Sequence, residues 1–366
     1  MAKRHPAHRR AAWALRLLLA AALVPVSCGS SGAARAQPAY YVVNSPEMRF
    51  LGVYAAASGR RLGSPATSPG TVEGISAGED GTFYLSLRTE KAVTASPAPA
   101  TEGPQPLRTP FVPQPTPQPT PSSGGGGACA TSVIRMNVSS DGARHTFEPF
   151  VPVLGEEEHA SATALTRDGA RLAYLPDGCG GTARALRVLD TATRRLTTWT
   201  AERDNRPLQI RSLAWNGDGD LLAVSAVVPC EPEPGSLCLP GAAVLVLDTR
   251  GTGGDLDDAR LLRRLERSPA GTPIAYSHDG DALFVATSDQ DRHAVIEISA
   301  ADGSLVREVF SHDAPNQHIA ALALDRSSSH LLVAATWGLE RLDLSGGRAQ
   351  RLPLPLEGRQ TFQIAW

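Results

Sequence analysis

The sequence of 366 residues is poor in aromatic side chains, at 5%, and in methionine, of which it has 3. Alanine, valine and leucine supply most of its apolar content, so we expect a core of thin, closely spaced sheets. An excess of basic charge is also missing, because 35 Lys and Arg face 37 Asp and Glu. Residues 1–36 hold six of the basic residues and no acid, which leaves 29 basic against 37 acidic residues, a net charge of −8. Nucleic acid and anionic lipid require a cationic surface, so neither is expected to bind the folded body.

Motifs of common enzyme classes are absent. The sequence has no P-loop, no HExxH, no CxxC and no G-x-G-x-x-G before a helix. Residues 74–78 match the nucleophile elbow G-x-S-x-G, but that motif joins a strand to a helix, and here strands are predicted on both sides. We interpret the match as accidental. No α/β-hydrolase segment follows the repeats described below, which excludes the prolyl-oligopeptidase architecture.

The apolar run at residues 17–26 is too short to span a bilayer comfortably, and it follows a basic segment, so it predicts an export signal. Two processing sites compete. A small-x-small site at residues 34–36 predicts a signal peptide of residues 1–36. Residues 26–32 resemble a bacterial lipobox, which predicts a lipoprotein signal of residues 1–27, lipid on Cys28 and a tether at residues 28–38, although Pro25 departs from that pattern. Both routes predict an extracellular or cell-envelope protein, and on the second route Cys28 anchors it to the outer leaflet of the cytoplasmic membrane.

Cysteine is scarce, with 5 residues. Either route removes Cys28 from the free thiols and leaves four, an even number that suits an oxidising compartment. The four are Cys129, Cys179, Cys230 and Cys238.

One pattern is repeated along the chain: two short apolar runs flank an Asp-Gly turn, which predicts a tight β-hairpin. Its copies are residues 74–87, 162–175, 211–226, 273–287 and 320–336, and residues 361–366 are the first half of another. A second hairpin type follows each copy. Its examples are residues 49–62, 132–150, 185–200, 242–264, 294–310 and 339–354. An all-strand repeat of about 50 residues is typical of a β-propeller.

These hairpins predict an all-β fold, a six-bladed β-propeller of four-stranded antiparallel blades, within a single domain at residues 39–366. The Asp-Gly hairpin would supply strands A and B of each blade, and the second hairpin strands C and D. Residues 361–366 would then give strand A of the blade whose strand B is residues 39–44, so the N- and C-terminal strands pair and close the ring. A proline- and glycine-rich insertion at residues 96–127, expected to be disordered, and another at residues 228–241 interrupt two B-to-C connections.

The turn motifs resemble those of bacterial WD-repeat-like propellers of the TolB and YVTN type. The resemblance lies in Tyr276-Ser277-His278-Asp279-Gly280 and in the matching residues 215–219 and 165–169, while residues 189–191 and 247–249 match the turn after strand C. The Trp-Asp pair of eukaryotic WD repeats is absent. Such propellers share a scaffold and not a reaction, so the resemblance implies the fold alone.

The predicted fold suggests a cysteine pairing. Cys129 and Cys179 fall in B-to-C connections of adjacent blades, and Cys230 and Cys238 bracket one loop. We therefore predict the disulfides Cys129–Cys179 and Cys230–Cys238.

Polar residues gather in the predicted D-to-A connections, which emerge on one face around the channel. The candidate binding face comprises Glu158, His159, Asp204, Arg206, Asp313 and His318. Carboxylate, imidazole and amide groups at a channel mouth could bind a divalent cation, as in propeller lactonases. Because no fixed spacing marks them as ligands, we interpret them as solvated loop residues. His278 is expected to be exposed in a turn, and His145 and His330 to be satisfied in place.

Two classes of function remain. The first is a non-catalytic binding or scaffold propeller with an extracytoplasmic protein, peptide or glycan as its partner, no catalytic residue, and no cofactor or metal. The alternative is a metal- or cofactor-dependent hydrolase, lactonase or lyase with its site at the channel mouth. We expect a monomer.

Overall fold

The computed structural model describes residues 39–45, 50–68, 70–90, 129–151, 154, 159–177, 185–203, 206–228, 241–256, 258–265, 272–289, 291–315, 317–353 and 363–366. Residues Gln37–Trp366 form one compact unit. The regular elements of the described residues are all β-strands. In this part of the chain no helix has the length and apolar character needed to cross a membrane.

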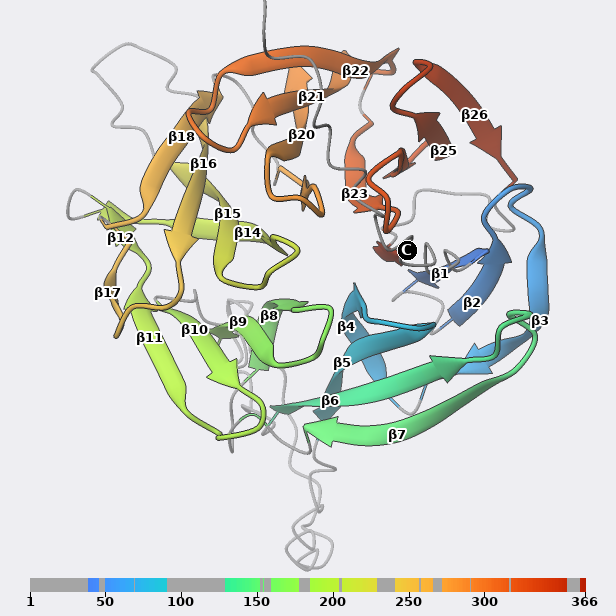
Figure 1. Cartoon of the computed structure of the whole chain (residues 1–366), viewed down its shortest axis with the longest axis horizontal. Helices are drawn as coiled ribbons and strands as arrows, with labels where there is room; N and C mark the ends of the chain where they lie inside the picture. The colour runs from blue at the N-terminus through green and yellow to red at the C-terminus, as the bar shows by residue number, and fades with distance from the viewer. Residues whose placement is uncertain are drawn as a thin grey trace, which may run out of the picture. The chain divides into compact units, whose positions relative to one another are not determined.

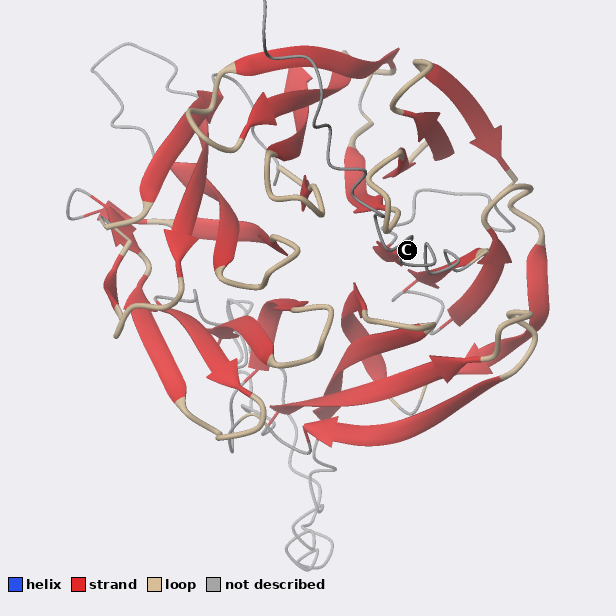
Figure 2. Ribbon diagram, in the orientation of Figure 1, coloured by secondary structure: helices blue, strands red, loops and turns tan. Residues whose placement is uncertain are grey.

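Six blades are arranged in a ring, each built on four antiparallel strands with the first at the centre and the last at the outside (Figures 1 and 2). Blade 1 is β27 (Gln363–Ala365), β1 (Tyr40–Ser45), β2 (Phe50–Ala55) and β3 (Arg61–Thr67), and blade 2 is β4 (Thr71–Ala77), β5 (Thr82–Glu90), β6 (Cys129–Val138) and β7 (His145–Val151). Blade 3 is β8 (His159–Leu165), β9 (Arg171–Asp177), β10 (Ala185–Asp190) and β11 (Leu196–Thr200), and blade 4 is β14 (Gln209–Trp215), β15 (Leu221–Val228), β16 (Gly241–Asp248) and β18 (Arg260–Leu265). Blade 5 is β19 (Ile274–Tyr276), β20 (Ala282–Asp289), β21 (Arg292–Ser299) and β22 (Leu305–Asp313), and blade 6 is β23 (Ile319–Leu324), β24 (His330–Ala335), β25 (Gly338–Asp343) and β26 (Arg348–Leu352). The six-bladed propeller predicted from the repeats is confirmed.

Blade 1 closes the ring with strands from both ends of the chain. β27 pairs antiparallel with β1, with Val43 opposite Ile364 and Asn44 opposite Gln363. The buried Asn44 amide donates to Gln363 Oε1 (3.0 Å) and to the Val72 carbonyl of blade 2 (3.3 Å). The predicted pairing of the N- and C-terminal strands is therefore confirmed.

Side-chain hydrogen bonds explain why the turns between strands A and B repeat the same sequence pattern. In blade 5 the Ser277 hydroxyl donates to Asp279 Oδ1 (2.6 Å) and accepts from the Ala282 amide (2.9 Å). Thr166 and Asp168 repeat this arrangement in blade 3. Gly280 follows with φ of 79°, a conformation that favours glycine.

Blade 3 carries a fifth strand that the repeat pattern did not predict. β17 (Gly254–Asp255) leaves the C-to-D connection of blade 4 and pairs in parallel with β11. The Leu256 amide then donates to the Thr200 carbonyl (3.1 Å), and the Leu256 side chain is fully buried in a cluster with Trp199. A short hairpin of β12 (Glu202–Arg203) and β13 (Arg206–Pro207) leads from blade 3 to blade 4.

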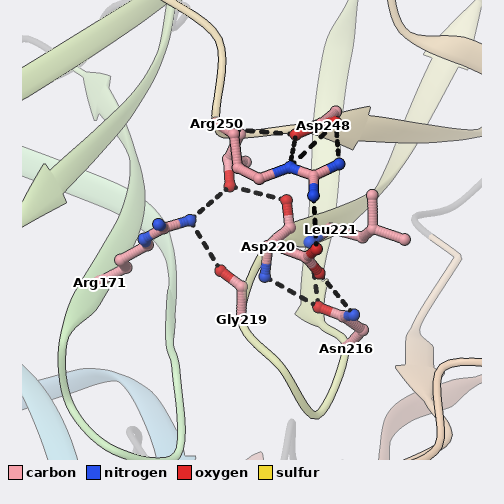
Figure 3. Close-up of polar contacts among 8 residues, drawn as sticks. Arg171, Asn216, Gly219, Asp220, Leu221, Asp248 and Arg250 are labelled. Carbon is pink, nitrogen blue, oxygen red and sulfur yellow. Dashed lines mark hydrogen bonds and ion pairs between the residues drawn. The ribbon is translucent and has the colours of Figure 1, made fainter.

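Polar contacts add to the apolar packing between blades (Figure 3). Arg171 of β9 reaches into blade 4, where its Nη1 donates to the Gly219 carbonyl (3.0 Å) and to the Thr249 hydroxyl (3.1 Å). Within blade 4, beside this contact, Arg250 pairs with Asp248 at 2.6 Å and with Asp220 at 3.5 Å. Hydrogen bonds from the Arg250 side chain and backbone amide lower the pKa of Asp248 to about 2.

Because antiparallel strands alternate in direction, the connections fall into two sets. The D-to-A and B-to-C connections emerge on one side, here called the loop face, and the A-to-B and C-to-D turns on the other, here called the turn face. β5 ends at Glu90 and β6 begins at Cys129, so the predicted proline-rich insertion joins strands B and C of blade 2. Residues 229–240 join the same strands of blade 4. Both insertions themselves lie outside the described residues.

Candidate functional site in the central channel

The innermost strands of all six blades line a channel, and the described residues border a cavity near each of its two faces. The loop-face cavity, of about 360 Å³, is bordered by the first halves of these strands. The turn-face cavity, of about 170 Å³, is bordered by their second halves and by several A-to-B turns. The propeller therefore offers two separate sites on its axis, one at each face.

Aliphatic side chains lie between the two cavities. Those that border both are Ile75, Leu213, Ile274, Leu322 and Ile364, from five different blades. Thr163 occupies the equivalent position in blade 3 and hydrogen bonds to the Ser86 hydroxyl (2.7 Å). We call the five aliphatic residues the aliphatic ring. The ring gives each cavity an apolar floor.

Polar side chains surround the loop-face cavity above this floor. Glu73 of β4 pairs with Arg88 at 3.9 Å, and Arg211 of β14 donates to Gln209 Oε1 (3.0 Å). Gln363 donates to the Glu73 carbonyl, which joins blade 1 to blade 2 at the rim. An apolar floor below acidic, basic and amide groups can hold a ligand that is itself part apolar and part polar.

The structure separates two of the residues expected together at the channel mouth. His318 precedes β23, is exposed and borders the loop-face cavity. Asp313 instead ends β22, the outermost strand of blade 5, where it lies opposite Arg292. Its neighbour His312 stacks on Trp337 of blade 6, with ring centroids 4.6 Å apart. Of this pair, His318 alone belongs to the channel.

The remaining predicted residues fall at or beyond the edge of the described chain. Glu158, Asp204, Cys28, Cys179, Cys230 and Cys238 lie outside it. His159, Arg206 and Cys129 are described as the first residues of β8, β13 and β6, without their side chains. The disulfides and the lipid anchor stay predictions. Among the described residues, no group of three or more His, Cys, Asp or Glu side chains is placed to hold a metal ion.

The histidines outside the channel can be compared with their expected roles. His278 is exposed in the A-to-B turn of blade 5, as predicted. His330 is satisfied in place, because its Nδ1 lies 3.1 Å from Asp325 Oδ2. His145 begins β7, and its ring packs edge-on against Phe147.

Sequence reasoning missed the aliphatic ring and the rim residues Glu73 and Arg211, although the repeats contain a signal for them. Ile75, Thr163, Leu213 and Ile274 each stand five residues before the Asp of an Asp-Gly turn, and Leu322 stands five before Ser327, which replaces that Asp in blade 6. Glu73 and Arg211 stand seven residues before the same Asp. Equivalent positions of the blades surround the axis of a propeller. An alignment of the repeats on their turns would therefore have identified both the aliphatic ring and the rim residues.

The comparisons with known proteins agree with the fold. No protein-family model matches the sequence, and no curated protein is significantly similar to it. Among solved structures, TolB from Acinetobacter baumannii is similar with a TM-score of 0.52 and 11% identity, over 89% of this chain and 65% of that one. The chain thus spans just under two thirds of the TolB structure. The periplasmic gluconolactonase PpgL of Pseudomonas aeruginosa aligns with a TM-score of 0.47 and 15% identity, over 89% of this chain and 98% of that one. This protein has the six-bladed propeller fold found in TolB.

Proposed function

We propose that the protein is an exported, non-catalytic binding module whose loop face recognises an extracytoplasmic protein or peptide. The observation that carries the proposal is the loop-face cavity, which combines the floor of the aliphatic ring with the polar rim of Glu73, Arg211 and His318. Pockets that bind a partner typically fix an apolar anchor in a concave site and orient it with a few polar groups. The innermost strands of six blades hold this site on a rigid scaffold, where binding sites of proteins are often found.

Export is supported by the N-terminal sequence. Residues 1–36 combine a basic segment, a short apolar run and two candidate processing sites. The remaining chain, with its net charge of −8, suits a protein or glycan partner better than a nucleic acid. If the chain is processed as a lipoprotein, lipid on Cys28 anchors the protein to the membrane.

The test is affinity capture from envelope extracts with the mature protein as bait, using variants that alter the rim and the floor separately. Arg211→Glu reverses an exposed rim charge, and Leu213→Arg places a charge at the cavity floor. Arg60→Glu makes the same charge change in an exposed turn of the opposite face and serves as the control. We expect the wild type and Arg60→Glu to retain the same partner, and Arg211→Glu to retain about tenfold less, as expected for the loss of a charged hydrogen bond.

Unchanged capture by both Arg211→Glu and Leu213→Arg would contradict the proposal. The same proteins should be assayed for lactone hydrolysis. A turnover that is lost in His318→Ala or His159→Ala would favour the enzyme alternative, since both residues lie on the loop-face side of their blades.

A further inference from the structure

The turn-face mouth of the channel is surrounded by one residue from each A-to-B turn. The residue just before the Asp of the turn is Arg167 in blade 3, Gly217 in blade 4 and His278 in blade 5, and these three border the turn-face cavity. Glu79 and Arg326 hold the same position in blades 2 and 6. Three of these five side chains are basic.

Adjacent turns contact one another around this mouth. The Glu79 amide donates to the Arg167 carbonyl (3.2 Å), and the His278 amide donates to the Ser328 hydroxyl (2.8 Å). Gly217 lies so close to His278 that a Cβ atom on it would collide with the His278 carbonyl oxygen. The basic side chains are therefore carried by a connected collar of turns rather than by independent loops.

The charged guanidinium of Arg167 has no hydrogen-bond acceptor among the described residues of this collar. Its side chain is partly buried, and within the described part of the chain its guanidinium makes no hydrogen bond or ion pair. Burial is the main cause that lowers its pKa, followed by the charge of Arg326, while Asp325 and Glu79 act in the opposite direction. A guanidinium has five donors in a planar fork, and leaving them without acceptors in a partly desolvated place is costly.

Nearby carboxylates are already engaged elsewhere. Asp80 pairs with Arg326 at 3.6 Å. Asp325 accepts hydrogen bonds from the backbone amides of Ser329 (2.8 Å) and His330 (3.0 Å). Asp279 accepts from Ser277 within its own turn. The ion pair with Asp80 compensates the charge of Arg326, and Asp279 and Asp325 accept hydrogen bonds within their own turns. Among the described residues that border the turn-face cavity, Arg167 is therefore the cationic group with no bonded carboxylate.

His278 is influenced by the same two arginines. Although His278 is largely exposed, partial desolvation of its ring is the first cause that lowers its pKa, and Arg167 and Arg326 lower it further. The three basic groups are therefore near enough to act on one another, although they come from three different blades. At neutral pH the lowered pKa leaves the His278 imidazole mainly uncharged, so it can act as a hydrogen-bond donor, while Arg167 and Arg326 carry the like charges that a nearby anion would stabilise.

We propose that the turn-face cavity binds a small oxyanion, with Arg167 as its main contact and His278 beside it. The cavity of about 170 Å³ is smaller than the roughly 300–1,000 Å³ of sites for drug-sized ligands, so it suits one phosphate or carboxylate group. A guanidinium binds either group through two parallel charge-assisted hydrogen bonds. This site lies on the opposite face from the proposed partner site and does not depend on it.

The test is isothermal titration of the mature protein at neutral pH and constant ionic strength, with inorganic phosphate in one series and citrate in another. Arg167→Gln should weaken binding of the preferred anion by about tenfold or more, because a charge-assisted hydrogen bond is lost. Arg144→Gln, at an exposed C-to-D turn of the same face, is the matched control and should bind as the wild type does.

Comparison of the two series identifies the anion, because phosphate and carboxylate ligands are tested separately. Arg167→Lys retains the charge without the planar fork and should give an intermediate affinity. The proposal is overturned if the wild type binds neither anion, or if Arg167→Gln binds with unchanged affinity while its melting temperature shows it to be folded.

Discussion

The Ser277 hydroxyl shows how one side chain fixes a turn of the propeller. It is buried, and it links the Asp279 carboxylate to the Ala282 amide across the hairpin. The hydrogen bond from Ser277 is the largest cause that lowers the pKa of Asp279 below its ordinary value of 3.8. A lowered carboxyl pKa stabilises the fold above the ordinary value, and that stabilisation is lost as pH falls through the lowered one.

Replacing Ser277 with alanine should therefore reduce stability at neutral pH and flatten the acid side of the stability profile. We expect a loss of about 1–2 kcal/mol at neutral pH, because the partly buried Ala282 amide loses its side-chain acceptor. Urea unfolding at pH 7 and at steps below pH 4 measures both effects. Ser64→Ala, at an exposed position of β3, should change the free energy of unfolding by less than about 0.5 kcal/mol. A Ser277→Ala protein as stable as the control would contradict the role given to this hydroxyl.

Among the elements, β17 is the one that ties two blades together through the backbone. It belongs to the chain of blade 4 but pairs with Trp199 and Thr200 at the end of β11, so this part of the outer edge of blade 3 is paired on both sides. Edge strands expose unpaired backbone groups, so this cover protects blade 3 from pairing with other chains. Leu256 holds the cover in place through its buried contact with the Trp199 cluster.

We predict that Leu256→Ala lowers the free energy of unfolding by about 2–4 kcal/mol, since it leaves a cavity between blades 3 and 4. Leu196→Ala is a matched control, because Leu196 lies on β11 itself but is 44% exposed. It should cost less than about 0.5 kcal/mol. Chemical denaturation followed by tryptophan fluorescence measures both variants, and equal losses would show that β17 is not anchored through Leu256.

The regular hairpins could be predicted from the sequence, and the irregular elements could not. Strands A and B flank an Asp-Gly turn whose residues favour a tight hairpin, so the local sequence is enough to predict these hairpins. β17 has only two residues, stands in a glycine-rich segment and shows no hydrophobic periodicity. Its pairing with β11 depends on the position of blade 3 in the folded protein, which the local sequence does not show. His312 and Asp313 were expected in a loop, but β21 begins at Arg292 and pairs with β22 as far as Asp313. His318 borders the loop-face cavity because it stands directly before an innermost strand, and its role in binding stays a prediction.

At the scale of the whole molecule, blade 1 differs from the others because no A-to-B turn joins its two inner strands. β27 and β1 come from opposite ends of the chain and are held by backbone pairing. Side chains strengthen the junction: Asn44 and Gln363 bond to each other and to backbone carbonyls of blade 2. Arg326 of blade 6 also reaches Asp80 of blade 2, so an ion pair spans the blade that has no turn. Stability of the ring therefore depends on a strand of three residues and a few contacts beside it.

Deleting residues 361–366 tests this dependence. The deletion removes β27, whose Ile364 and Ala365 are buried, together with the buried Trp366, and it exposes the inner edge of β1, where Val42 and Val43 are fully buried. Removal of an innermost strand exposes the backbone and the apolar side chains of the neighbouring strand to water. We therefore expect loss of cooperative unfolding. Circular dichroism during heating measures the transition, and Gln363→Ala, which keeps the backbone pairing, should retain it at a cost of about 1–2 kcal/mol. Adding the six-residue peptide in excess should restore part of the transition by mass action. A truncated protein that melts sharply, within a few degrees of the full chain, would show that five complete blades and β1 to β3 are stable without β27.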